Sequence, residues 1–143
     1  MMVQLLKAKI HRATVTATEL DYVGSVTLDA GLLDAAGLQE YEKILAVNVT
    51  SGARFETYCI AGPRGSGVVC VNGAAARLAV PGDLLIVMAF CGLDRDEALA
   101  WKPRVVFVDG RNAPIRVDSG ERHGDSFTGG VPVPPPPSGG GGG

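Results

Sequence analysis

The sequence predicts a mainly β domain, a small barrel or sandwich with short helices. Short runs rich in branched and aromatic residues recur along the chain, and turn signals made of Gly, Asn and Pro separate them. The segments with helical character are all short. The longest apolar run, residues 84–91, is too short to span a bilayer, so no membrane partner is expected. These features are typical of small β-barrels and sandwiches.

The expected strands follow from runs of Val, Ile, Thr and aromatic residues. The first strand contains Ile10, Thr14 and Val15, and side-chain alternation puts Lys9 and His11 on one face of it. Ser51-Gly52 separates two later runs and predicts that they form a hairpin. The expected strands are 5–15, 24–28, 42–50, 54–60, 68–71, 84–90 and, as the last one, 105–108.

Capping residues mark two short helices. Asp29 suits the start of a helix over 29–37 and Gly37 suits its end. Asp94 opens a capping-box pattern that leads toward Trp101, and Pro103 stops this second helix. The other expected connections are a turn or single helical turn at 16–20, a glycine-rich loop at 62–67, a tight turn at 72–73 with both residues suited to positive φ, a helical turn at 74–78 and a turn at 81–83.

Length and composition indicate one domain, residues 1–117, followed by a tail. The chain has 143 residues, and from 118 onward it becomes polar and then rich in Pro and Gly. Such a composition buries too little apolar surface to offset chain entropy, so we expect residues 118–143 to be disordered.

Charge, leader pattern, cysteines and histidines restrict the function classes. The net charge is −2, from 13 basic and 15 acidic residues, which disfavours a nucleic-acid partner. The first residues show no secretory leader pattern, so a cytoplasmic location is expected. Three widely spaced cysteines predict buried, inert thiols and no disulfide framework. His11 and His123 lie far apart, so no metal site is expected.

One stretch, Leu20-Asp21-Tyr22-Val23-Gly24-Ser25-Val26-Thr27, carries a resemblance when read with its neighbours. It follows Lys9-Ile10-His11-Arg12 and precedes Asn48-Val49-Thr50, Arg54-Phe55-Glu56-Thr57-Tyr58, 61–66 and 71–76, in this order. Over about residues 1–117 the chain resembles the pyruvoyl-dependent aspartate decarboxylases. The resemblance implies a double-psi β-barrel that forms a homotetramer, with active sites between neighbouring subunits. It also implies conversion of L-aspartate to β-alanine for pantothenate and coenzyme A synthesis.

The resemblance implies self-cleavage between Gly24 and Ser25. Decarboxylation of an amino acid leaves electrons on the α-carbon, and a carbonyl joined to the substrate amine can accept them. No standard side chain carries a ketone. In the family the serine becomes a pyruvoyl group that forms a Schiff base with the substrate, without pyridoxal phosphate or a metal. Gly24 offers an unhindered carbonyl, and Ser25 supplies both the nucleophile and the leaving oxygen.

The family also implies roles for other residues of this sequence. Tyr58 matches the proton donor, and Thr57 matches a residue used in both cleavage and substrate binding. Arg54 and Lys9 match cations of the substrate pocket, and a guanidinium suits a carboxylate. Asn72 matches a residue of processing. The remaining positions are Gly73, Ala74 and Ala75, whose backbone would hold substrate. Beside these family roles, Tyr22 is expected at the border of the site, and His11 fits equally a functional neighbour there or a structural hydrogen-bonding histidine.

Other interpretations remain open from the sequence. Gly24-Ser25 alone is an ordinary loop dipeptide, and an unprocessed small β-barrel would be a binding or scaffold module. The same electron sink would also serve glutamate or cysteate, because the sequence does not reveal the pocket length. The segment Arg64-Gly65-Ser66-Gly67 resembles a phosphate loop but lacks its GK[ST] ending.

Overall fold

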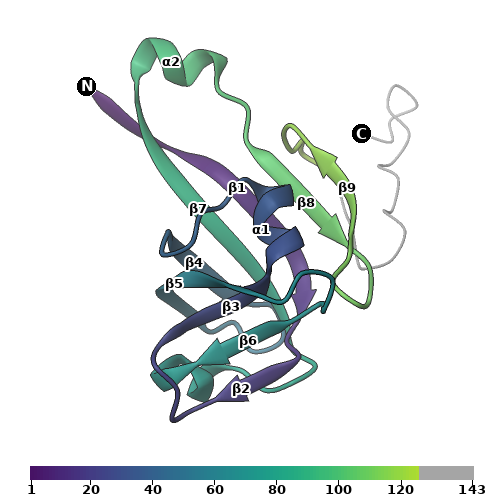
Figure 1. Ribbon diagram of the computed structural model, residues 1–143. Coiled ribbons are helices and arrows are strands. Elements are labelled where there is room, and N and C mark those ends of the chain that lie inside the picture. The colour runs from purple at the N-terminus through teal and green to yellow at the C-terminus, as the bar shows by residue number, and fades with distance from the viewer. Residues whose placement is uncertain (126–143) are drawn as a thin grey trace.

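A computed structural model describes residues 1–125 (Figure 1). Strands dominate, and the helices are short. In chain order the elements are β1 Met2–Thr14, β2 Ala17–Glu19, β3 Ser25–Asp29, α1 Ala30–Ala36, β4 Lys43–Asn48, β5 Arg54–Gly62, β6 Val69–Asn72, the 3-10 helix η1 Gly73–Leu78, β7 Leu84–Asp94, α2 Arg95–Ala100, β8 Arg104–Val108 and β9 Pro114–Asp118.

The strands form one mixed sheet in the order β2-β6-β3-β5-β4-β7-β1-β8-β9. Three pairs are parallel, β1 with β8, β2 with β6 and β3 with β5, while the others are antiparallel. β5 serves both halves of the sheet, because its residues 54–58 pair with β4 and its residues 59–62 pair with β3. The mainly β fold with short helices is confirmed, and it is consistent with a double-psi β-barrel.

Most expected elements occur where the sequence predicts them, including the β4–β5 hairpin and both capped helices. The expectation of a helical turn at 16–20 is wrong, because Ala17–Glu19 is a strand paired with β6. The Thr16 hydroxyl also donates to the carbonyl oxygen of Val69 and accepts from the backbone N–H of Val69. The strand at 105–108 is not the last one, because β9 pairs beside it. At the 72–73 turn only Gly73 has positive φ, since Asn72 is extended at −105°.

The core lies on one face of β3 and β6. Val26 and Leu28 of β3 and Val69 and Val71 of β6 are fully buried in the main apolar cluster. Side chains alternate along a strand, so the residues next to these core positions point to the opposite face. Ser25, which precedes Val26 and is the second half of the proposed cleavage site, lies on that face.

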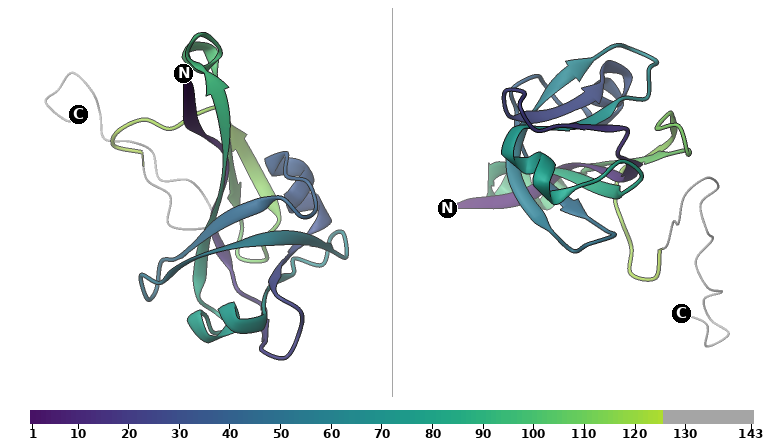
Figure 2. Two further views of the ribbon diagram at one scale, coloured as in Figure 1. Left: turned by 90° about the vertical axis from the view of Figure 1, so that its left-hand side faces the viewer. Right: turned by 90° about the horizontal axis from the view of Figure 1, so that it is seen from below.

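The long antiparallel strands β1 and β7 run side by side, and β1 begins where β7 ends, next to α2 (Figures 1 and 2). The indole Nε1 of Trp101, just after α2, donates to the carbonyl of Leu6 at 2.8 Å. This bond links the segment after α2 to β1 at the projecting end of the molecule. None of the helices in residues 1–125 is long and apolar enough to cross a membrane.

The expected tail, 118–143, begins within the described residues. Asp118 ends β9, and the carboxylate of Glu121 lies 2.9 Å from Lys9 Nζ. Residues 126–143 lie outside the described residues, so the domain boundary at 117 stays a prediction.

Asp29 joins the end of β3 to the glycine-rich loop. Its carboxylate is 5% exposed and accepts N–H bonds from Gly31 at 2.7 Å, Gly65 at 3.1 Å and Gly67 at 2.8 Å. Burial acts to raise the Asp29 pKa, but the three N–H donors and the nearby Arg64 charge bring it below its ordinary value of 3.8. The loop amides that resembled a phosphate cradle are therefore engaged with a carboxylate of the chain itself.

We expect Asp29→Asn to lower the free energy of unfolding at pH 7 by about 2–3 kcal/mol, since an amide offers one acceptor oxygen where the carboxylate has two. The lowered pKa means that the carboxylate stabilises the fold above pH 3.8 and loses this effect as pH falls through its folded-state pKa. Melting temperatures measured from pH 7 to pH 3 check this. The acid-induced loss should be smaller in the variant, and Asp34→Asn, at an exposed ion pair with Arg64, should change little. An unaltered pH profile would contradict the assignment.

Candidate active site

Gly24 and Ser25 lie where an exposed loop enters β3. Gly24 is exposed, whereas Ser25 is buried at 1% exposure. Ser25 has φ of 110°, a backbone conformation that residues with a Cβ rarely adopt. Strain of this kind costs on the order of 1–3 kcal/mol and persists only where the surrounding structure enforces it. The strained residue is the serine that the sequence analysis singles out.

Asn72 lies directly across from Ser25 on β6, as its register partner. The Asn72 side chain is 2% exposed, and its Nδ2 donates to Ser25 Oγ at 3.3 Å. The same Nδ2 donates to Thr27 Oγ1 at 2.9 Å, and Cys70 Sγ donates to Asn72 Oδ1 at 3.2 Å. The expected processing residue therefore contacts the expected nucleophile.

Gly73 packs against the backbone of the cleavage candidate. It has φ of +69°, and a Cβ at this position would lie 2.8 Å from Gly24 Cα and 3.3 Å from the Tyr22 carbonyl oxygen. Only a glycine allows the two backbones to approach this closely. Ala74 and Ala75 follow in η1, so the segment expected to hold substrate adjoins Gly24.

Thr57 and Tyr58 occupy opposite faces of β5. Thr57 pairs with the buried Ile44 and shares its face with the core residue Cys59. Tyr58 lies on the other face, and its ring contacts that of Tyr41 at 6.3 Å. Because Val26 pairs with Cys59, the Ser25 and Tyr58 backbones are neighbours in register. In the described part of the chain no hydrogen bond joins the Thr57 hydroxyl to Gly24.

Among residues 1–125, neither of the expected cations forms a hydrogen bond with Ser25. Arg54 is exposed at the start of β5, and among residues 1–125 its guanidinium has no ion-pair partner. Lys9 is on β1, which β7, β4 and β5 separate from β3 in the sheet order, and it pairs with Glu121. His11 is also on β1, with its ring 5.8 Å from the Phe107 ring.

Comparison with known proteins identifies the family of the chain. The family model described as aspartate decarboxylase matches residues 1–115. The chain belongs to this family. It is 55% identical to an aspartate 1-decarboxylase of Pelotomaculum thermopropionicum over 87% of this chain and 94% of the relative. A protein of the same name from Acetivibrio thermocellus is 54% identical over 87% and 99%, and one from Campylobacter jejuni is 53% identical over 89% and 100%.

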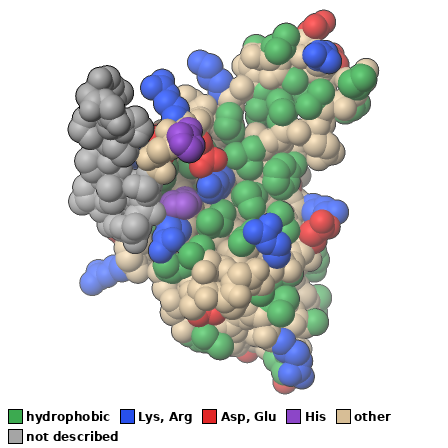
Figure 3. Space-filling model, turned by 180° about the vertical axis from the view of Figure 1, so that it is seen from behind, with side chains coloured by type: hydrophobic (Ala, Val, Ile, Leu, Met, Phe, Trp, Pro, Cys, Tyr) green, Lys and Arg blue, Asp and Glu red, His purple; other side chains and the backbone are tan. Residues whose placement is uncertain are grey.

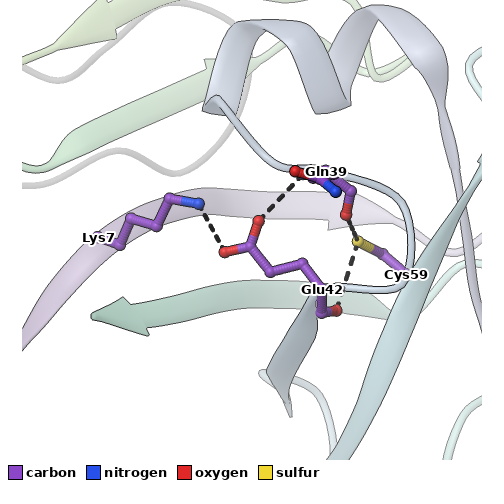
Figure 4. A network of polar contacts seen from close by, with 4 residues as sticks. All are labelled: Lys7, Gln39, Glu42 and Cys59. Atoms are coloured by element: carbon purple, nitrogen blue, oxygen red, sulfur yellow. Dashed lines mark hydrogen bonds and ion pairs between the residues drawn. The ribbon is translucent and has the colours of Figure 1, made fainter. Parts of the chain in front are cut away.

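A polar network holds residues 39–42 against Cys59, the residue that follows Tyr58 (Figure 4). Lys7 Nζ contacts Glu42 Oε2 at 2.7 Å, and Glu42 Oε1 accepts from the backbone N–H of Gln39 at 3.0 Å. Cys59 Sγ donates to the carbonyl oxygens of Gln39 and Glu42. Burial, and secondarily the Glu42 charge, raises the pKa of the Cys59 thiol to about 11, so it stays protonated as a donor.

Thr27 and Cys70 both contact Asn72, although neither was expected from the sequence to be a site residue. A signal was present, because Thr27 is two residues beyond Ser25 and Cys70 is two residues before Asn72, which puts each pair on one strand face. Cys59 and Cys70 are buried as expected, and Cys91 is only half-buried. Within residues 1–125 no group of three or more His, Cys, Asp or Glu side chains is arranged to hold a metal ion.

Proposed function

We propose that the protein converts L-aspartate to β-alanine and CO2 after cutting its own chain between Gly24 and Ser25. One observation carries this most directly. A buried serine with a strained backbone follows an accessible glycine and accepts a hydrogen bond from Asn72, in a chain of the aspartate decarboxylase family. These groups fit the origin of a pyruvoyl group, because that group forms from a serine after its hydroxyl has attacked the preceding carbonyl.

The cleavage uses only groups of the chain and water. Ser25 Oγ attacks the Gly24 carbonyl carbon, the proton of the hydroxyl passes to the departing nitrogen, and the amide becomes an ester. The Ser25 α-proton then leaves to water, its electron pair forms the Cα–Cβ double bond, and Oγ departs as the new Gly24 carboxylate. Water converts the remaining dehydroalanine to a ketone with release of ammonia. The strained φ of Ser25 raises the energy of the starting amide and so favours the first step.

The resulting pyruvoyl group, with no pyridoxal phosphate, would supply the electron sink for decarboxylation. Tyr58 then donates a proton to the α-carbon, which suits a phenol beside a strongly basic carbon. Arg54 and Lys9 bind carboxylates of the substrate, and Thr57 contributes a hydroxyl to the same pocket. The backbone N–H groups of residues 73–75 hold the substrate beside position 25.

A homotetramer would bring the cations to the cleaved serine. Among residues 1–125, Arg54 and Lys9 form no hydrogen bond with Ser25, so a neighbouring copy is the simplest source of positive charge. Hydrophobic side chains gather on the projecting end and the adjoining face (Figure 3). The exposed ones there include Met2, Phe90, Leu99 and Trp101, and such a patch is typical of an interface between protein chains.

β-Alanine produced in this way would serve pantothenate and coenzyme A synthesis. We expect the enzyme in the cytoplasm, which cell fractionation checks.

Intact-mass measurement of the purified protein tests the proposal. We expect two species, residues 1–24 and residues 25–143, the larger beginning with a pyruvoyl group, together with β-alanine formation from L-aspartate. Glutamate and cysteate, assayed in parallel, test the length of the pocket. A single full-length species that stays inactive on long incubation would overturn the proposal and favour the alternative, an unprocessed β-barrel that acts as a binding or scaffold module.

We expect Arg54→Ala to raise the KM for aspartate about ten- to a hundred-fold, because a bidentate bond between a guanidinium and a carboxylate is lost. Steady-state kinetics on fully cleaved protein measure this. Arg95→Ala removes an exposed cation of α2 and is the matched control. An unchanged KM in the Arg54 variant would remove this residue from the substrate pocket.

A further inference from the structure

Four residues form a cross-strand patch on the face of β3 and β6 that points away from the core: Ser25, Thr27, Cys70 and Asn72. Ser25 pairs with Asn72 and Thr27 pairs with Cys70 in the antiparallel register. Directly opposed side chains on one face of such a pair are close enough to interact. Three of the four are buried, and Thr27 is half-buried. The patch is therefore a shielded polar cluster around the serine of the proposed cleavage site.

Every polar atom of the Asn72 carboxamide is used within this patch. The two N–H bonds are directed at Thr27 Oγ1, at 2.9 Å, and Ser25 Oγ, at 3.3 Å. The oxygen accepts from Cys70 Sγ at 3.2 Å. A carboxamide has two donor hydrogens on one side and an acceptor on the other, so these partners define which side faces Ser25.

The partners also oppose the reversed orientation. A reversed carboxamide would direct its N–H groups at the Cys70 thiol, which is a weak acceptor, and would leave Ser25 without a donor. Burial, followed by the charge of Glu19, raises the pKa of the Cys70 thiol, so the thiol keeps the proton that it donates. Because the amide is buried, an unsatisfied group there is costly, and the observed orientation is favoured.

We propose that Cys70 and Thr27 are positioning residues that hold the Asn72 carboxamide with an N–H on Ser25 Oγ during self-cleavage. The inference rests on the proposed function. As the ester breaks, the Cβ–Oγ bond cleaves and Oγ leaves with the electron pair as part of the Gly24 carboxylate. An N–H donor already aimed at Oγ stabilises the charge that develops there. Cys70 and Thr27 act only through Asn72 and touch no bond that changes.

Cys70→Ala and Thr27→Val each remove one contact that holds Asn72, while Cys70→Ser replaces the thiol donor with a hydroxyl donor and Thr27→Ser keeps the hydroxyl. Cys59→Ala is the matched control, because it also removes a buried thiol that donates to an oxygen, but one outside the patch. For each full-length chain, intact mass gives the first-order rate constant of cleavage, and hydroxylamine sensitivity gives the fraction held as ester. Melting temperature reports on folding.

We expect Cys70→Ala and Thr27→Val to cleave about five-fold more slowly or worse, the factor that loss of one neutral hydrogen bond typically produces. The ester fraction should rise in both, because Oγ departure loses its donor. Cys70→Ser, Thr27→Ser and Cys59→Ala should cleave at close to the rate of the unaltered protein. A merely structural role would lower the melting temperature without enriching the ester.

Three other results would overturn the inference. If Cys70→Ala and Thr27→Val cleave like the unaltered chain, the residues do not position Asn72. If slowing occurs without ester enrichment, or the serine variants fail to restore the rate, the contacts act in another way. Failure of the proposed function is distinguishable from all three, because the unaltered protein itself would then remain a single chain.

Discussion

Ser25→Ala is expected to stay a single chain of 143 residues and to release no CO2 from aspartate above a blank. In the proposed chemistry the substitution removes both the nucleophile and the residue that becomes the ketone, so cleavage and the electron sink would be lost together. The Cβ remains, so the strained backbone at φ 110° is unchanged and folding should be little affected. Intact mass and a β-alanine assay measure the two outcomes.

Ser66→Ala is a suitable control for this experiment. Ser66 lies in the glycine-rich loop, where its hydroxyl donates to the carbonyl of Pro63 and accepts from the N–H of Val68, and its loss should leave cleavage and activity intact. A Ser25→Ala protein that forms β-alanine at the normal rate would refute the proposed chemistry.

Gly73→Ala should be the second severe change, with cleavage slowed at least about ten-fold and the fold destabilised. Two penalties combine. The backbone at φ +69° disfavours any Cβ by about 1–2 kcal/mol, and the new Cβ would lie 2.8 Å from Gly24 Cα. Relief of that contact requires a shift of Gly24, the residue whose carbonyl Ser25 must attack. Cleavage kinetics by intact mass, together with chemical denaturation, measure both effects.

Gly52→Ala separates the two penalties. Gly52 has φ of +80°, but a Cβ there would meet nothing within 4 Å, so the variant carries the conformational cost alone. We expect Gly52→Ala to lose stability by about 1–2 kcal/mol and to cleave normally. Equal cleavage rates in the two variants would show that the contact between Gly73 and Gly24 is unimportant.

The fold was largely predictable because strong local signals coincide with its elements. Asp29 and Gly37 cap α1, Asp94 caps α2, and Ser51-Gly52 joins β4 to β5. The failures were β2 and β9. Both are short and end in an acidic residue, and they become strands through pairing with β6 and β8 rather than through their own composition. Pairing between distant segments leaves no trace in a local pattern.

The site was predictable only in part, for a related reason. Gly24-Ser25 and Asn72-Gly73 are recognisable together through the family resemblance, and the structure brings these two segments into contact. Thr27 and Cys70 resemble ordinary strand residues, and only the register of β3 against β6 gives them contacts with Asn72. The roles of Arg54 and Lys9 stay predictions, because one chain does not unite them with Ser25.

The position of β1 between β7 and β8 has a consequence for the severed molecule. A break after Gly24 would leave residues 1–24 as a separate peptide, yet thirteen of them form a strand that pairs with β7 along most of its length and with β8 over residues 8–11. The chain of residues 1–24 would therefore remain bound in the folded protein and dissociate only on denaturation. The unfavourable φ angle at position 25 would no longer exist once the peptide nitrogen of that residue is lost. Cleavage would therefore remove this backbone strain while the surrounding barrel stays folded.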